Sequence, residues 1–118
     1  MVEIYVLDIE EIKNLSLYQK IKKERKIKME NKIVLKVSSK SNPNSVAGAI
    51  AGGLQENKKV ELQAIGAGAV NQSIKAIAIA RSFVAAIGVD LSCIPAFCTV
   101  MVENEEKTGM KFIIKEDK

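Results

Sequence analysis

The sequence contains no histidine and no tryptophan, and aromatic residues make up only 4% of its 118 residues. Histidine is the commonest general base and a frequent metal ligand near neutral pH, so its absence disfavours most enzymes and many metal sites. Few aromatic rings leave little surface for the base stacking that many RNA-binding domains use. Binding through aromatic platforms is therefore disfavoured as well.

Cysteine is also scarce. Cys93 and Cys98 lie five residues apart in an apolar run, with no second pair and no histidine to complete a zinc site, so we expect buried free thiols. No apolar stretch approaches the roughly 18 uncharged residues of a membrane span, and the start at Met1 lacks the basic lead of a signal peptide. We expect a cytoplasmic protein that uses no metal, cofactor or membrane.

The net charge is +4 and the isoelectric point is about 9.1, which favours an acidic partner without identifying one. Much of the excess lies in residues 17–28, which hold six basic side chains and one acidic one, Glu24. Such a segment could bind nucleic acid or a membrane surface, but a solvated run of charges is the commoner outcome. We assign it no function.

The chain has the length and the apolar content, 47%, of one domain with a modest segment attached. From Lys32 onward the apolar pattern predicts the order β-α-β-α-β-β. The predicted strands are residues 33–37, 60–65, 89–102 and 107–115, and the helices run from Pro43 to about 57 and from 68 to 87.

Local signals support these elements. Asn42 can cap the first helix, and Pro43 suits its first position. Three glycines in that helix, at 48, 52 and 53, predict a close approach of other groups to its backbone. In the second helix we expect an apolar stripe that ends before Gly88. Its members are Val70, Ile74, Ile77, Val84 and Ile87.

The last two strands contain two residues that are unusual in sheets. Pro95 cannot donate a hydrogen bond to a neighbouring strand, so it predicts an edge strand or a bulge. Gly109 suggests a bulge. The turn between the strands is expected at residues 103–106.

Two loops each follow a strand and open a helix, at residues 38–45 and 65–72. A right-handed crossover makes the first two strands parallel, so both loops emerge at the same carboxyl edge of the sheet. A helix N-terminus carries unpaired N–H groups and roughly half a positive charge. The loops therefore predict one shared anion-binding surface.

Residues 29–118 resemble the stage V sporulation protein S family, small proteins of endospore-forming bacteria with an Alba-like fold. The resemblance rests on long literal runs rather than on a short motif. These runs are Leu35–Ser38, Ser41–Gly52, Gln63–Gln72, Lys75–Ala76, Ala78–Arg81, Gly88–Leu91 and Cys93–Phe97.

The resemblance implies an α/β fold of the α+β two-layer sandwich type, in which a mixed four-stranded sheet carries two helices on one face. It implies a sporulation-associated regulator and, by analogy of fold, a homodimer that binds DNA or RNA. Residues 1–28 precede the family pattern. They are either a helical extension, in which Asp8 and Glu11 are spaced as a capping box, or the product of an upstream start codon.

In Alba-like proteins the nucleic-acid face lies around the loop before the first helix and the start of the second. Lysine supplies charge, serine and amide side chains supply hydrogen bonds, and glycine lets backbone N–H groups approach a phosphate. None of these groups reads a base uniquely, so weak sequence preference is expected. The matching residues are Lys40, Ser41, Asn42, Asn44, Ser45, Gly66, Gly68, Asn71, Gln72 and Lys75.

Other interpretations stay open. The same serine, asparagine and glycine residues could serve as helix caps and tight turns. Alba proteins often have a basic hairpin between the last two strands, whereas Glu103, Glu105 and Glu106 make this one acidic. That difference favours RNA, short oligonucleotides or another anionic ligand over wrapping of a duplex.

Two further function classes remain. An enzyme is disfavoured because no nucleophile has a neighbouring base and no Walker motif follows Gly68. The main alternative to nucleic-acid binding is a protein-interaction or dimerisation module built on the small residues Gly48, Gly52 and Ala76.

Overall fold

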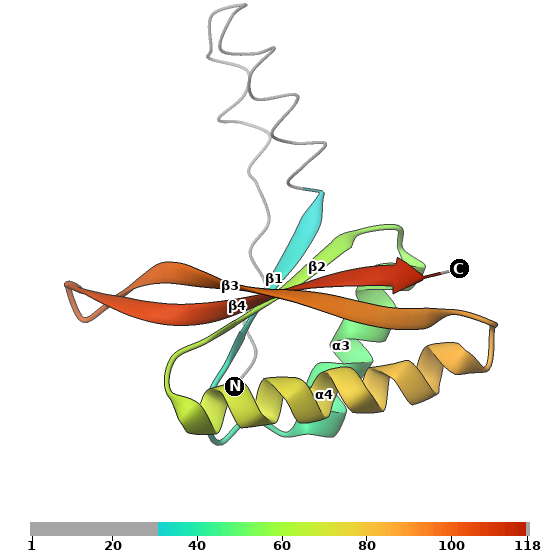
Figure 1. Cartoon of the computed structure of the whole chain (residues 1–118), viewed down its shortest axis with the longest axis horizontal. Coiled ribbons are helices and arrows are strands. Elements are labelled where there is room, and N and C mark those ends of the chain that lie inside the picture. The colour runs from blue at the N-terminus through green and yellow to red at the C-terminus, as the bar shows by residue number, and fades with distance from the viewer. Residues whose placement is uncertain (1–30, 118) are drawn as a thin grey trace, which may run out of the picture.

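The computed structural model describes residues 31–117, and the predictions for residues 1–28 lie outside this part of the chain. The described residues form four strands and two helices in the predicted order (Figure 1). The elements are β1 (Lys32–Val37), α3 (Pro43–Gln55), β2 (Lys59–Ala64), α4 (Ala67–Ala85), β3 (Asp90–Val102) and β4 (Glu105–Asp117).

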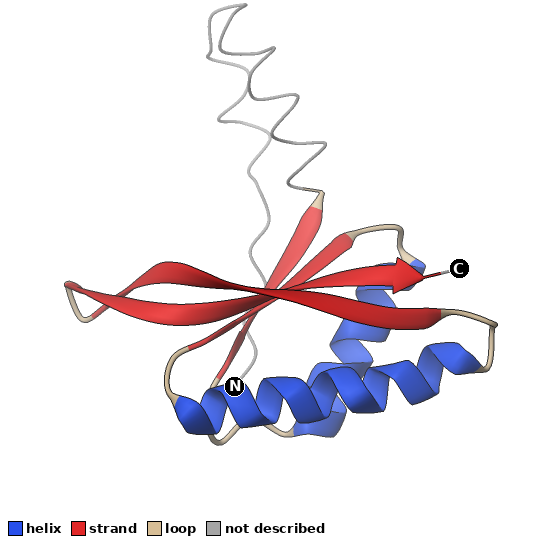
Figure 2. Ribbon diagram, viewed as in Figure 1, coloured by secondary structure: helices blue, strands red, loops and turns tan. Residues whose placement is uncertain are grey.

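The strands form one mixed sheet in the order β1-β2-β4-β3. β1 and β2 run parallel and pair residue by residue from Lys32 with Lys59 to Val37 with Ala64. β4 lies antiparallel to both β2 and β3. Both helices cover the same face of the sheet (Figure 2), so the predicted α+β two-layer architecture is confirmed.

The core lies between the sheet and the helices. On the covered face, Leu35 of β1, Leu62 of β2 and Phe112 of β4 lie on neighbouring strands and are buried, while Val46 and Ile50 of α3 pack onto them. Burial of one such aliphatic side chain stabilises the fold by about 1.5–3 kcal/mol. The alternation of buried and half-buried residues along β1 is the pattern of a sheet with one open face.

The predicted stripe of α4 is partly wrong. Ile77 and Val84 are buried, but Ile74 is 46% exposed and Ile87, beyond the helix end, is 66% exposed. The buried side of α4 is instead made mainly of small residues, which let the helix lie close to α3 and the sheet. These residues are Ala69, Ser73, Ala76 and Ala80.

The glycines of α3 differ in their surroundings. A Cβ atom on Gly53 would lie 2.9 Å from Val60 Cγ2 and 3.0 Å from Ile33 Cδ1, so the predicted close approach is confirmed there. A Cβ atom on Gly48 or Gly52 would meet nothing within 4 Å, so the prediction was wrong for these two.

β3 is an edge strand of the sheet, as the interpretation of Pro95 required. The register between β3 and β4 is uninterrupted from Asp90 opposite Asp117 to Val102 opposite Glu105, so the bulge suggested at Gly109 is absent. β2 reaches only as far as Met110 of β4, where Ala64 pairs. Residues 98–109, named the arm below, therefore extend beyond β2 as a two-stranded ribbon (Figure 1).

The arm ends in a tight turn of two residues, Glu103 and Asn104, with φ angles of 51° and 65°. The turn is shorter than the predicted residues 103–106, because Glu105 and Glu106 already belong to β4. Positive φ angles at both central residues are typical of a type I′ hairpin turn, which favours Asn-Gly.

Replacing Glu103→Asn together with Asn104→Gly is expected to raise the free energy of unfolding by about 1 kcal/mol, because a glutamate in the left-handed region is strained. Urea denaturation of the double variant against the parent measures the change. Glu106→Gln removes one acidic charge without touching the turn and serves as the control. If Glu106→Gln raised the free energy of unfolding as much as the double variant does, the gain would come from the lost charge, and the assignment of the turn would be contradicted.

Candidate functional site

The two predicted loops meet at the carboxyl edge of the parallel strands, at the end of the molecule where the arm also lies (Figure 2). Gln72 of α4 donates a hydrogen bond from Nε2 to the backbone oxygen of Ser41, at 2.8 Å. A Cβ atom on Gly68 would lie 2.8 Å from Ser39 Cβ, so this glycine allows the start of α4 to rest on the first loop. Residues 38–45 and 65–75 thus form one surface, named the loop edge below.

The N-terminus of α3 is capped by the protein itself. Asn42 Oδ1 accepts the backbone N–H groups of Asn44, at 2.8 Å, and Ser45, at 3.4 Å. Pro43 has no N–H group, and the N–H group of Val46 bonds to the Asn42 carbonyl. An anion would find no unpaired N–H group here, so capping explains Asn42 without a ligand.

The N-terminus of α4 has no such cap. Gly66 precedes the helix with a φ of 89°, and no side chain caps the first turn. The Gly66 carbonyl accepts the N–H group of Val70, and the first turn carries no acidic residue. Gly66, Ala67 and Gly68 are exposed. The backbone here has the charge, the donors and the access that an anion requires.

The predicted site residues fall into two groups. Ser41 is 2% exposed, and its hydroxyl accepts the Ser38 N–H group at 2.9 Å, so together with half-buried Gln72 it holds the two loops together. Ser73, the residue after Gln72, is buried and donates to the Ala69 carbonyl. The other predicted site residues are exposed: Lys40, Asn42, Asn44, Ser45, Gly66, Gly68, Asn71 and Lys75.

The loop edge carries two exposed cations. Lys40 lies in the first loop, and Lys75 lies two turns into α4. Within residues 31–117 no salt bridge joins either lysine to an acidic side chain. The sequence prediction missed Ser39, on which α4 rests; its only signal was its position directly after β1.

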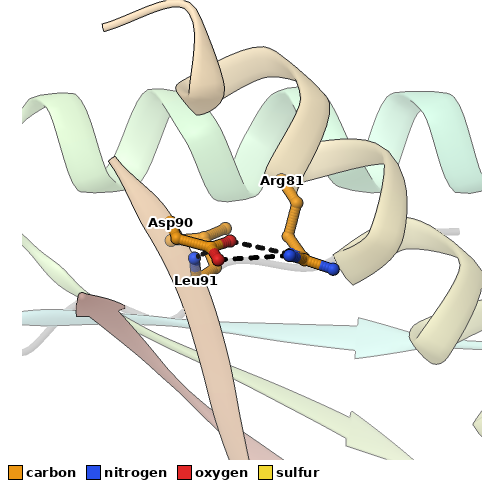
Figure 3. Close-up of polar contacts among 3 residues, drawn as sticks. All are labelled: Arg81, Asp90 and Leu91. Carbon is orange, nitrogen blue, oxygen red and sulfur yellow. Dashed lines mark hydrogen bonds and ion pairs between the residues drawn. The ribbon is translucent and has the colours of Figure 1, made fainter. Parts of the chain in front are cut away.

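Arg81 forms the best-defined ion pair among the described residues, away from the loop edge (Figure 3). Its Nε donates to Asp90 Oδ1 at 2.7 Å and its Nη2 to Asp90 Oδ2 at 3.1 Å. Asp90 Oδ1 also accepts the Leu91 N–H group at 2.8 Å. The pair links α4 to the first residue of β3 and therefore has a structural role.

The hydrogen bonds from Arg81, followed by the one from Leu91, lower the pKa of Asp90 below its ordinary value of 3.8. A lowered folded-state pKa stabilises the protein above the unfolded-state pKa, and this contribution disappears as the pH falls through the folded-state pKa. Arg81→Gln is expected to raise the Asp90 pKa toward its ordinary value, as followed by NMR titration of the carboxyl carbon. An unchanged titration curve would contradict the pairing in solution.

The two cysteine residues lie outside the loop edge. Cys93 and Cys98 are unpaired and partly buried, and burial raises the pKa of the Cys98 thiol, so its reactive thiolate is disfavoured. Residues 31–117 contain no group of three potential metal-ligating side chains among Cys, Asp and Glu. No helix in the same part of the chain is long and apolar enough to cross a membrane.

Comparison with protein families gives a match over most of the chain. The model of the family described as Stage V sporulation protein S (SpoVS) matches residues 33–117. The match covers all four strands apart from Lys32, the first residue of β1, and it includes both helices, the loop edge and the arm.

Proposed function

Because the chain belongs to the stage V sporulation protein S family and is therefore a sporulation-related protein, we propose that it acts by binding nucleic acid through the loop edge. One observation carries the proposal. The uncapped N-terminus of α4 lies against the loop that carries Lys40, Lys75 follows two turns along the same helix, and Gln72 fixes the helix to that loop. Backbone donors, two cations and small exposed residues suit a phosphate group.

The chemistry of this surface concerns the backbone of the nucleic acid rather than its sequence. The N–H groups of the first turn of α4 would bond to phosphate oxygens, and Lys40 and Lys75 would neutralise the neighbouring phosphates. Asn44, Ser45 and Asn71 are exposed and can add neutral hydrogen bonds. Such contacts fix position but do not distinguish bases, so binding with weak sequence preference follows.

The proposed role is that of a non-enzymatic regulator in the cytoplasm. The loop edge brings together backbone amides, lysines and neutral polar groups, and no carboxylate lies in residues 38–45 or 65–75. A phosphate held there meets neither a general base nor a nucleophile with a base beside it. Binding and release, rather than bond cleavage, would carry the regulatory effect.

Fluorescence anisotropy tests the proposal with the full chain and labelled DNA and RNA oligonucleotides at rising salt concentration. We expect binding at low salt that weakens linearly in a plot of log affinity against log salt, with similar affinities for unrelated sequences. Absence of binding to both DNA and RNA at low salt would overturn the proposed function.

A second candidate, an interaction or dimerisation module, is favoured by a different observation. Phe97 lies on the edge strand β3 and is 78% exposed, and a strand edge offers unpaired backbone groups to another chain. Ala76, which the sequence prediction placed on such a surface, is fully buried, whereas Gly48 and Gly52 are exposed. Multi-angle light scattering of the parent and of Phe97→Ser separates a dimer formed through this edge, which the change would dissociate, from a monomer.

A further inference from the structure

A groove of about 320 Å³ lies between the loop edge and the arm. Its lining comes from residues 36–39 at the end of β1, from Gln63 and Ile65 at the end of β2, and from residues 100–102 of β3. We propose that this groove takes one unpaired nucleobase of a strand whose phosphates lie on the loop edge. The inference rests on the proposed function and adds the kind of nucleic acid, a single strand.

The polar part of the groove carries both donors and an acceptor. Lys36 on β1 is aligned with Gln63 on β2, and Gln63 is aligned in turn with Lys111 on β4, so a row of polar side chains crosses the open face of the sheet. Gln63 Nε2 donates one of its two N–H groups to Glu61 Oε2 at 3.1 Å, so the amide keeps Oε1 as an acceptor and a second N–H group as a donor. Lys36 already takes part in an interaction, and the three N–H groups of its ammonium allow it to donate to a ligand as well.

A donor beside an acceptor matches the edge of a nucleobase. Adenine and cytosine each carry an amino group next to a ring nitrogen acceptor, and guanine carries a carbonyl next to a ring N–H group. Because the Lys36 ammonium and Gln63 Oε1 suit several bases, they support binding of a base without strict selection. This agrees with the weak sequence preference expected of the loop edge.

The opposite wall is apolar. Val100, Met101 and Val102 form it, and Met101 is 59% exposed although it is large and hydrophobic. Ile65, on the side of β2, is also partly exposed. The flat faces of a base would bury this aliphatic surface, which takes the place of the aromatic rings that the sequence lacks. A groove of this size is at the lower end of the range for small-molecule sites, which suits a single nucleoside.

The groove and the loop edge are continuous. Ser38 and Ser39 line the groove, and the start of α4 rests on Ser39 through Gly68. A phosphate at the uncapped N-terminus of α4 would therefore stand next to the entrance of the groove. The base attached to that phosphate could then enter the groove. A phosphate bound to Lys75 alone would leave its base in solvent.

The surroundings favour a single strand over a duplex. A paired base would have to leave its stack and its partner to enter the groove, and the free energy that this costs would offset the gain from burial. The tip of the arm bears Glu103, Glu105 and Glu106, which would repel the phosphates of a second strand. Only a strand whose bases are already unpaired avoids both costs.

The test uses the full chain and a labelled oligonucleotide of about twelve residues, single-stranded or in a duplex, with 2-aminopurine as the central base. We expect the single strand to bind at least about tenfold more tightly, and 2-aminopurine emission to rise on binding because the base leaves its neighbours. Met101→Glu places a charge on the apolar wall and should remove both effects. Thr99→Glu adds the same charge to the same strand outside the groove lining and should keep both.

The outcomes separate the two proposals. Equal binding of single strand and duplex, with unchanged emission, would overturn the base-binding groove while the phosphate-binding loop edge stands. Equal effects of Met101→Glu and Thr99→Glu would also overturn the groove, since charge on the arm would then explain both. Absence of any binding at low salt would overturn the proposed function and the groove with it.

Discussion

Reversing two charges, by Lys40→Glu combined with Lys75→Glu, is expected to lower the affinity for every nucleic-acid sequence about a hundredfold at low salt. Each lysine is exposed and, within the described residues, has no acidic partner, so each can act on a phosphate group. A charge-assisted contact is worth about 1.5 kcal/mol or more, and two of them amount to about 3 kcal/mol, the free energy of a hundredfold change. Anisotropy titrations with two unrelated sequences measure the loss.

The control reverses two lysines at the opposite edge of the sheet. Lys59 begins β2, and Lys115 lies near the end of the antiparallel β4, so both are far along their strands from the loop edge. Lys59→Glu with Lys115→Glu changes the net charge by the same amount and should reduce the affinity far less. Equal losses in the two double variants would show that overall charge, rather than the loop edge, governs binding.

Gly109→Ala is expected to lower the free energy of unfolding by about 2 kcal/mol, the cost of overpacking a filled space. A Cβ atom at this position would lie 2.8 Å from the backbone oxygen of Ala64 and 3.1 Å from Ile65 Cγ1. A backbone oxygen cannot move aside as the end of a side chain can. The close approach joins the base of the arm to the end of β2, next to the groove. Urea denaturation measures the change.

Gly48→Ala is the matched control for this prediction. Gly48 is exposed in the interior of α3, and an added Cβ would meet nothing within 4 Å. Alanine is favoured over glycine in a helix by about 1 kcal/mol, so this variant should be more stable than the parent. Destabilisation of both variants by the same amount would contradict the distinction drawn between the two positions.

Much of the fold could be predicted from the sequence because local signals and hydrophobic patterns agree. Asn42 before Pro43 marks the start of α3, Gly88 with its φ of 77° ends the α4 region, and Pro95 excludes an inner strand. The effects of these residues arise from their own backbone chemistry and do not depend on which residues pack against them in the fold. The order of the elements followed from the apolar pattern, and the shared edge of the two loops followed from the right-handed crossover between parallel strands.

Properties that depend on tertiary neighbours could not be predicted in the same way. Helical spacing placed Ile74 on the buried side of α4, but α4 buries its alanines because they allow a closer approach to α3 and the sheet. Gly109 was interpreted as a bulge. Glycine is instead required there because a Cβ atom would meet the backbone oxygen of Ala64, 45 residues earlier in the chain. No local pattern contains that contact.

In the candidate site, too, local features could be predicted from the sequence and tertiary contacts could not. The sequence placed both helix N-termini on one surface, but the two are not equivalent: Asn42 fills the first, and the second begins at Gly66 without a cap. Ser41 and Gln72 were grouped with the ligand-binding residues, yet they bond to the loops themselves. The sequence shows which polar groups the loops contain, but it does not show which of them already form hydrogen bonds within the fold.

The most direct test of the central claim is an NMR titration of the ¹⁵N-labelled full chain with a short single-stranded oligonucleotide. The backbone amide signals of Ala67, Gly68 and Ala69, which open α4, should shift most, together with that of Lys40. The amide signals of Asn44 and Ser45 should move less, because Asn42 already accepts their hydrogen bonds. Shifts confined to other parts of the chain, with the first turn of α4 unchanged, would contradict the claim that this helix terminus holds the phosphate.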